Sequence, residues 1–191
     1  MRCFAAILLG EEVRHALGQE IQRLRPLSRA VAWVPAENLH MTLHFLGEQT
    51  EDRVADATAA LAEAVAATRP FSLTLHGVGA FPGLVRARIL WTGVSGGALD
   101  ARALHARVED ALEVRGFARE PRPWHPHVTL GRVFDERRWR QDAGRDLRPV
   151  IAGIAARSFG SFAVQSVTLM QSQLGRGGAH YRPVTEVPLG G

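Results

Sequence analysis

Hydrophobic positions along the chain recur with two spacings, one typical of strands and one typical of helices. Short apolar runs and alternating apolar and polar residues predict strands, and apolar residues three or four positions apart predict amphipathic helices. The predicted strands are 4–9, 31–34, 39–46, 71–78, 87–94, 127–133, 159–171 and 181–188, and the predicted helices are 11–24, 51–68, 98–115 and 135–145. Prolines and glycines at the breaks support these boundaries.

The order of these elements predicts the class of fold. Strands and helices are mixed without regular strand-helix-strand alternation, which favours an α+β fold with mainly antiparallel sheets. Each half of the chain offers strands, a long helix and one strand with the sequence His-x-Thr-Leu, so we expect two similar lobes around a central cleft with the helices outside. A length of 191 residues is typical of a single domain spanning 1–191.

The repeated His-x-Thr-Leu sequence is the main candidate for chemistry. It begins at His40 and again at His127, 127 − 40 = 87 residues apart. Side chains alternate along a strand, so His40 and Thr42 project from one face, as do His127 and Thr129. A single copy is ordinary strand sequence, with threonine chosen for its β propensity. Two copies in comparable strands predict a shared site.

Two histidines can perform acid-base chemistry at phosphorus without a metal. One neutral imidazole acts as a base and a second, protonated imidazole acts as an acid, which is what an in-line displacement requires. The hydroxyls of Thr42 and Thr129 can donate to non-bridging phosphate oxygens and stabilise the negative charge of the transition state. The motifs therefore predict a metal-independent phosphoesterase.

Composition excludes several other mechanisms. All 23 positively charged residues are arginine, and the absence of lysine excludes a lysine-adenylate, a lysine Schiff base and the lysine of a phosphate-binding P-loop. Arginine binds phosphate through two parallel hydrogen bonds, so the excess fits a phosphorylated or nucleic-acid partner. A genome-wide arginine bias explains it equally well. The single cysteine, Cys3, excludes an intrachain disulfide and fits a reducing cytoplasmic setting.

Two other hypotheses for the function stay open, a zinc site and an RNA-binding module. Spacings in His125-x-His127 and between His40 and His44 occur among zinc ligands, although no carboxylate or cysteine accompanies them. A non-catalytic RNA-binding module would account for arginines interleaved with aromatic residues. Those residues are Arg86, Arg88, Arg119, Arg122, Arg132, Trp91, Phe117 and Trp124. Of the tryptophans, Trp124 is the candidate to stack on a base, and Trp91 is expected in the core.

Longer stretches of the sequence resemble a known family, the bacterial and archaeal RNA 2',3'-cyclic phosphodiesterases, also called 2'-5' RNA ligases, of the two-histidine phosphoesterase superfamily. The resemblance covers nearly the whole chain. It is carried by 2–7, by 38–48 and 126–132 around the two motifs, by 88–91, and by Ser172, Leu174, Gly175 and Tyr181.

The resemblance implies specific roles. His40 would be the proton donor, His127 the proton acceptor, and Thr42 and Thr129 ligands of the phosphate. The reaction would open an RNA 2',3'-cyclic phosphate to a 2'-phosphate, and its reversal would join a cyclic end to a 5'-hydroxyl without ATP. No cofactor or metal is implied, the partner is RNA, and we expect a soluble, cytoplasmic monomer without a membrane span.

Three further residues are candidates for substrate binding: Arg132, Trp124 and Tyr181. Strict alternation from His127 places Arg132 on the opposite face of its strand, so a bulge or strand end is needed to bring it to the phosphate. Alternation from His40 places His44 on the catalytic face, where we favour a solvated side chain, and Phe45 in the core. The glycine-rich 175–178 segment is read as a hairpin turn rather than a phosphate-binding loop.

Overall fold

The computed structural model of the protein describes residues 1–143, 146–175 and 178–190. Its strands are β1 (Arg2–Leu8), β2 (Val31–Trp33), β3 (His40–Glu48), β4 (Phe71–Phe81), β5 (Ile89–Gly96), β6 (Val128–Val133), β7 (Ser158–Val164), β8 (Ser166–Gly175) and β9 (Gly178–Pro188). Its helices are α1 (Glu11–Leu24), α2 (Glu51–Ala66), α3 (Ala98–Val114), α4 (Glu136–Arg138) and α5 (Leu147–Gly153), with 3-10 turns at Arg25–Leu27, Ala36–Asn38 and Leu84–Arg86 and a π-helical turn at Trp139–Ala143.

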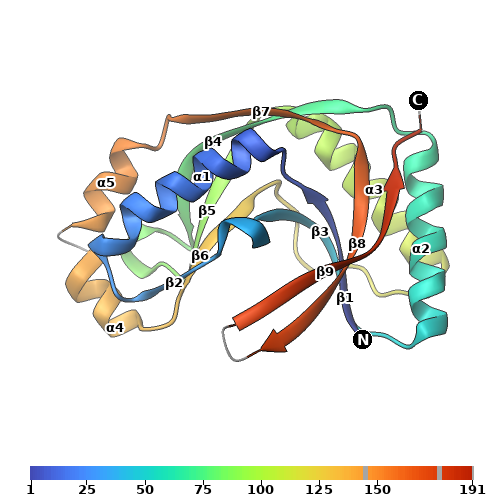
Figure 1. Ribbon diagram of the computed structural model, residues 1–191, viewed down its shortest axis with the longest axis horizontal. Coiled ribbons are helices and arrows are strands. Elements are labelled where there is room, and N and C mark those ends of the chain that lie inside the picture. The colour runs from blue at the N-terminus through green and yellow to red at the C-terminus, as the bar shows by residue number, and fades with distance from the viewer. Residues whose placement is uncertain (144–145, 176–177, 191) are drawn as a thin grey trace.

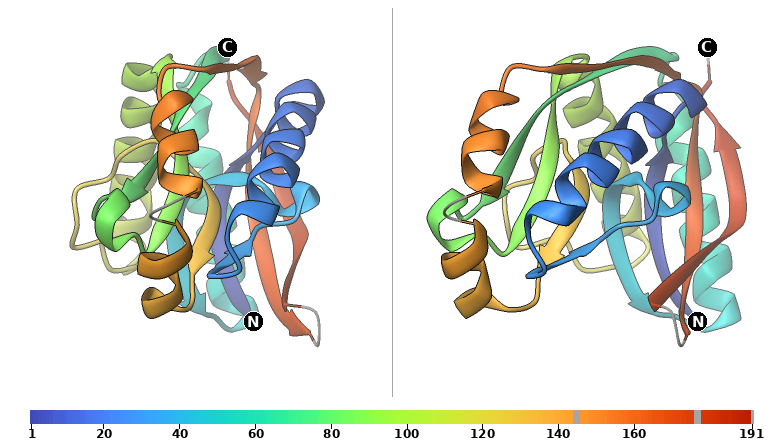
Figure 2. Two further views of the ribbon diagram at one scale, coloured as in Figure 1. Left: turned by 90° about the vertical axis from the view of Figure 1, so that its left-hand side faces the viewer. Right: turned by 60° about the vertical axis from the view of Figure 1, so that its left-hand side comes forward.

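The strands form two antiparallel sheets, which confirms the predicted α+β class. Sheet A has the order β3-β1-β8-β9, and sheet B has the order β2-β6-β5-β4-β7. Helix α2 packs on β8 and β9 of sheet A and on α3, whereas α1 contacts β7 and α5 contacts β4 of sheet B (Figure 1). Helices lie outside both sheets, as the views from the side also show (Figure 2). None of the described helices is long and apolar enough to cross a membrane.

Between residues 135 and 171 the structure differs from the prediction in two predicted elements and one further helix. The apolar run predicted as one strand over 159–171 is two strands, β7 in sheet B and β8 in sheet A, with Gln165 between them. No glycine or proline marks this crossing, so the sequence pattern could not reveal it. The helix predicted over 135–145 is α4 followed by the π-helical turn, and its last two positions, 144 and 145, lie outside the described residues. Helix α5 was not predicted.

The hairpin predicted around the glycine-rich segment is present. Strands β8 and β9 pair over their whole length, ending at the pair Gly175 and Gly178. Residues 176 and 177 lie outside the described part of the chain. The pairing confirms a strand hairpin on the two sides of these residues.

Both histidine motifs contain a β-bulge at their leucine. In β3, Ala6 pairs with Thr42 and Ala5 pairs with His44, which leaves Leu43 as the extra residue. A bulge adds one residue to a strand and so reverses which face each later side chain occupies. Our expectations for the next two residues were therefore wrong: His44 is 3% exposed, and Phe45 is 58% exposed.

The second bulge has the same place in its motif. In β6, Thr129 pairs with Trp91 and Gly131 pairs with Leu90, which leaves Leu130 unpaired. Arg132 pairs with Ile89, which alternation places on the same face of β5 as Trp91. Arg132 thus shares the face of Thr129, and the bulge that the sequence required for this is present. Leu43 and Leu130 are both buried in the core.

Two glycines with positive φ angles allow a comparison of strain with steric clash. Gly97, between β5 and α3, has φ 80°, and a Cβ added there would lie 2.0 Å from the carbonyl oxygen of Ser72. Gly116, after α3, has φ 77° with open space around it. We predict that Gly116→Ala lowers the free energy of unfolding by about 1 kcal/mol and that Gly97→Ala lowers it by about 3 kcal/mol or more, since the clash adds to the strain.

Denaturant unfolding of the purified variants measures both effects. Gly153→Ala is the control, because this glycine lies in α5 with open space around it and outside the positive-φ glycines. It should be neutral or stabilising by up to about 1 kcal/mol. Equal losses at Gly97 and Gly116 would contradict the close approach of Gly97 to Ser72.

Candidate active site

The two histidine motifs lie where sheet A meets sheet B. His40 is the first residue of β3, His127 directly precedes β6, and these two strands contact each other. The indole N–H of Trp124 donates a hydrogen bond of 3.0 Å to the main-chain carbonyl of Thr42, which joins the segment before His127 to the first motif. We call His40, Thr42, His127, Thr129 and Arg132 the two-histidine site.

Both imidazoles are held in the same way by the main chain. Nδ1 of His40 lies 2.7 Å from the carbonyl oxygen of Asn38, and Nδ1 of His127 lies 2.7 Å from that of His125. A carbonyl oxygen only accepts, so Nδ1 carries a proton in each ring. In the neutral form Nε2 is then free to accept a proton. In the protonated form the same atom can donate one.

The ring of His40 lies in an aromatic environment on sheet A. Its centroid is 4.9 Å from that of Phe4 and 5.2 Å from that of Tyr181. Burial lowers the pKa of His40 below its usual value, and the positive charge of Arg132 and the charge of His127 lower the pKa further. The carbonyl of Asn38 opposes this shift. Neutral His40 is therefore favoured, and its Nε2 accepts from the Thr42 hydroxyl at 3.0 Å.

Other predicted site residues occupy different surroundings. Tyr181, on β9, contacts both Phe4 and His40, so it lines the His40 side of the site. Trp124 stacks its indole on the imidazole of His105, with centroids 4.4 Å apart, and so already has one aromatic partner. Base stacking by Trp124 stays a prediction.

The bulges reveal site residues that the sequence pattern missed. Phe45 pairs with Phe4 across the sheet, and their ring centroids lie 6.1 Å apart, so Phe45 shares the His40 face. Trp91, expected in the core, pairs with Thr129 and is partly exposed. Its indole lies over Gly79 and Gly93, where a Cβ would come within 2.6 Å and 3.1 Å of the ring. Only knowledge of the bulges could have placed Phe45.

His40 and His44, whose spacing suggested a zinc site, lie on opposite faces of β3. Nδ1 of His44 pairs with the Glu109 carboxylate on the buried side of β3, whereas His40 lies on the opposite face. No cluster of three histidine, cysteine or acidic side chains suitable for a metal occurs among residues 1–143, 146–175 and 178–190. The pair His40 and His44 therefore does not form the chelate that the spacing suggested.

Several of the aromatic and arginine residues behind the RNA-binding-module hypothesis have partners within the protein. Phe117 is buried, with the guanidinium of Arg53 stacked on its ring at 3.8 Å. Arg119 pairs with Asp110 and Glu113, and Arg88 lies 3.7 Å from Glu136. These arginines are neutralised by carboxylates, which weakens them as a phosphate-binding stripe.

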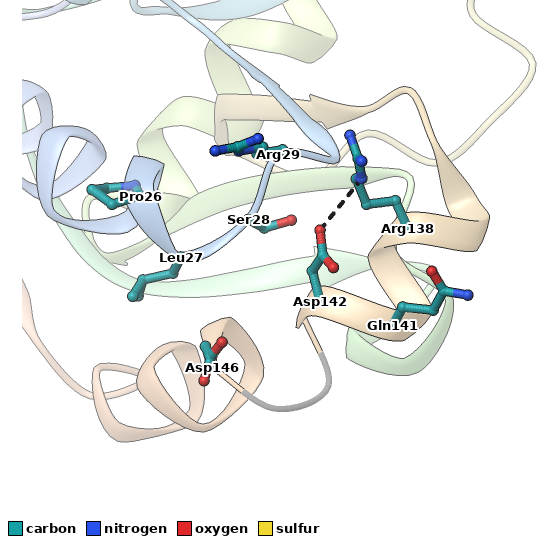
Figure 3. Close-up of a pocket in the computed structure, with 8 residues that line it drawn as sticks. All are labelled: Pro26, Leu27, Ser28, Arg29, Arg138, Gln141, Asp142 and Asp146. Atoms are coloured by element: carbon teal, nitrogen blue, oxygen red, sulfur yellow. Dashed lines mark ion pairs between the residues drawn. The ribbon is translucent and has the colours of Figure 1, made fainter.

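A separate cavity of about 420 Å³ lies beside the segment after α1. Figure 3 shows its lining, in which Arg138 faces Asp142 and Ser28 lies between Arg29 and Asp146. Arg138 lies 3.6 Å from Asp142, so the charges of the lining offset each other. Neither motif histidine lines this cavity, and its balanced charge does not indicate an anionic ligand.

Comparison with known proteins gives consistent matches over most of the chain. The family model of the 2'-5' RNA ligase superfamily matches residues 13–176. An RNA 2',3'-cyclic phosphodiesterase from Aeropyrum pernix is 37% identical over 156 residues, covering 81% of this chain and 84% of the relative. One from Aquifex aeolicus is 30% identical over 193 residues, covering 100% and 98%.

Solved structures show the same fold. The crystal structure of E. coli LigT complexed with 3'-AMP has a TM-score of 0.78 and 28% identity, covering 98% of this chain and 97% of that one. A Thermus thermophilus protein, TT0787, has a TM-score of 0.76 and 31% identity, covering 99% and 98%. These likenesses extend over both sheets.

The influence of Arg132 on His40 leads to a testable expectation. We predict that Arg132→Gln raises the pKa of His40, because a nearby cation disfavours the imidazolium form and its removal lifts that penalty. NMR titration of the imidazole C–H signals measures the change. Arg88→Gln is the control, since this exposed guanidinium lies beside Glu136 and is not among the charges that shift His40. An unchanged His40 titration in Arg132→Gln would show that the guanidinium is not near the ring.

Proposed function

The chain belongs to the 2'-5' RNA ligase superfamily, and from that premise we propose that it is an RNA 2',3'-cyclic phosphodiesterase that opens the cyclic phosphate to a 2'-phosphate. The observation that carries this proposal is the matched pair of imidazoles. Each has its Nδ1 proton directed to a main-chain carbonyl, which leaves Nε2 for proton transfer. Two such imidazoles, placed where the two sheets meet, can act as the base and the acid in a displacement at phosphorus.

The proposed reaction follows from these two Nε2 atoms. Nε2 of His127 takes a proton from water, and the water oxygen bonds to phosphorus. The bond from phosphorus to O3' breaks, and Nε2 of protonated His40 gives its proton to O3'. The ring opens to a 2'-phosphate and a 3'-hydroxyl, with the protons balanced between the histidines. No step requires a metal ion or other cofactor.

The negative charge on the phosphate is stabilised by polar and charged residues on the same strand faces as the two histidines. The hydroxyls of Thr42 and Thr129 and the guanidinium of Arg132 share the catalytic faces and can donate to the non-bridging oxygens. Binding of the substrate also favours the protonated form of His40, which is the proton donor. A bound phosphate anion favours imidazolium, so it opposes the lowering of the His40 pKa by burial and by Arg132. His40 would therefore gain its proton as substrate binds.

The partner in this proposal is an RNA or nucleotide with a 2',3'-cyclic phosphate end. The exposed ring of Phe45 offers a stacking surface for a base beside His40, and Tyr181 flanks the same imidazole. The reverse reaction would join a cyclic end to a 5'-hydroxyl through a 2'-5' bond, with hydrolysis dominant in water. We propose a cytoplasmic monomer, as expected from the single cysteine and the single set of site residues.

The first experiment is incubation of the protein with a short RNA ending in a 2',3'-cyclic phosphate, in excess EDTA, with separation of 2'-phosphate from 3'-phosphate products. We expect the 2'-phosphate only. His40→Ala and His127→Ala should each lower kcat by about a hundredfold or more, because each removes a proton-transfer group. Turnover that survives both substitutions would reject the mechanism. RNA binding without turnover by the unaltered protein would favour a binding module.

A second experiment assigns the acid and the base. A substrate with sulfur in place of O3' has a leaving thiolate, whose conjugate acid has a pKa of about 8.5, so its departure needs little proton donation. We predict that His40→Ala loses at least about tenfold less activity on this substrate than on the oxygen substrate. His127→Ala should lose equally on both, since water must still be activated. The opposite pattern would exchange the two roles.

A further inference from the structure

Helix α3 carries two polar residues on its buried side, behind the two-histidine site. Glu109 is 5% exposed, between the core residues Val108 and Leu112, and the side chain of His105 is 15% exposed one turn earlier. A carboxylate loses much of its hydration when it is buried, so it needs strong partners to be retained. Nε2 of His105 lies 3.9 Å from Oε1 of Glu109, and the other partners of these two residues belong to segments that carry the two motifs.

Glu109 joins α3 to β3 and to the segment before β6. One carboxylate oxygen, Oε1, accepts from Nδ1 of His44, two residues after Thr42. The other, Oε2, accepts from the main-chain N–H of Glu120 at 3.2 Å. A single buried carboxylate thereby fixes the middle of the 115–127 segment, at Glu120, to the strand that carries His40.

Trp124 makes the second connection of that segment. One face of its indole stacks on His105 with the ring planes 7° apart. Its N–H donates to the carbonyl of Thr42 at 3.0 Å, within the first motif. The indole thus lies between α3 and β3, and His127 follows only three residues later.

His127 depends on these connections because it lies outside the strand. β6 begins at Val128, which pairs with Thr92, so sheet B holds His127 from its C-terminal side and the 115–127 segment holds it from its N-terminal side. Its ring is bonded to the carbonyl of His125, in the same segment, and that bond moves with the segment. The position of His127 relative to His40 therefore depends on how the segment is attached to β3.

We propose that Glu109 and Trp124 are positioning residues that set the placement of His127 relative to His40, an inference that rests on the proposed phosphodiesterase function. Neither side chain transfers a proton to the substrate. Each acts through the main chain, Glu109 at Glu120 and Trp124 at Thr42. Proton transfer in the transition state requires reacting atoms near 3 Å, so a displacement of about 1 Å lowers the rate by up to about a hundredfold.

The test is the kinetics of Trp124→Phe and Glu109→Gln on the RNA 2',3'-cyclic phosphate substrate. Trp124→Phe keeps an aromatic ring for His105 and removes the N–H together with the five-membered ring of the indole. Glu109→Gln keeps the shape and removes the charge that faces His44. We expect kcat to fall about ten- to a hundredfold, with KM and the Kd of the 2'-phosphate product changed by less than about threefold, because the phosphate ligands stay in place.

Matched controls separate positioning from general stability. Trp139→Phe removes the same kind of bond, an indole N–H to the carbonyl of Leu84 at 3.0 Å, in the π-helical turn after α4. Asp110→Asn changes the exposed carboxylate next to Glu109, which pairs with Arg119. Both controls should keep the kcat of the unaltered protein, even where Trp139→Phe lowers the melting temperature.

The outcomes are distinguishable from failure of the proposed function. If the unaltered protein does not turn over the substrate, the function itself is rejected. If it does, and Trp124→Phe keeps its kcat, the positioning role is wrong. An equal loss of kcat in Trp139→Phe, or a loss in Trp124→Phe that tracks thermal unfolding, also overturns it. Should Glu109→Gln not fold, the Trp124→Phe result decides.

Discussion

A β-strand presents alternate side chains to its two faces, and one inserted residue reverses that order for every residue beyond it. Both strands that carry the His-x-Thr-Leu motif contain such an insertion at its leucine. Histidine and threonine precede the bulge on one face. The residue three positions beyond the threonine, Phe45 in one strand and Arg132 in the other, then returns to that face. The composition of the site depends on these two bulges.

The same constraint explains what could be predicted from the sequence. Periodicity placed α1 at its observed ends and the two motifs at β3 and β6, because core burial enforces regular spacing. It failed at His44 and Phe45, where the spacing changes within a strand. It also failed at Gln165, where the chain passes from one sheet to the other without a turn residue. Bulges and sheet exchange are decided by contacts between distant segments, which one sequence does not display.

Helix α3 is a case in which the sequence did hold a signal. His105 and Glu109 are four residues apart and fall beside Leu104, Val108 and Leu112 in the apolar stripe of the helix. Polar residues in such a stripe indicate buried partners. The identity of the partners, on β3 and on the segment before β6, required the tertiary structure.

The two imidazoles differ in their surroundings although they are held alike. His40 is enclosed by Phe4 and Tyr181 on sheet A, whereas Thr129 and Arg132 on sheet B supply polar and charged groups. One sheet thus lowers the polarity around a titrating ring, and the other supplies the cation that an anionic substrate requires. Under the proposed function, this combination would make the protonation of His40 respond to a bound phosphate.

The hydrogen bonds that fix the histidine tautomers have a consequence for how the protein tolerates mutation. Many histidines are oriented by a carboxylate side chain, which a single codon change can remove. Here the acceptors are the carbonyl oxygens of Asn38 and His125, which belong to the main chain. Every amino acid carries that carbonyl, so substitution at either position leaves the acceptor in place. The tautomer therefore depends on the path of the main chain. Substitutions at these two positions that keep this path leave the Nδ1 protons of His40 and His127 in place.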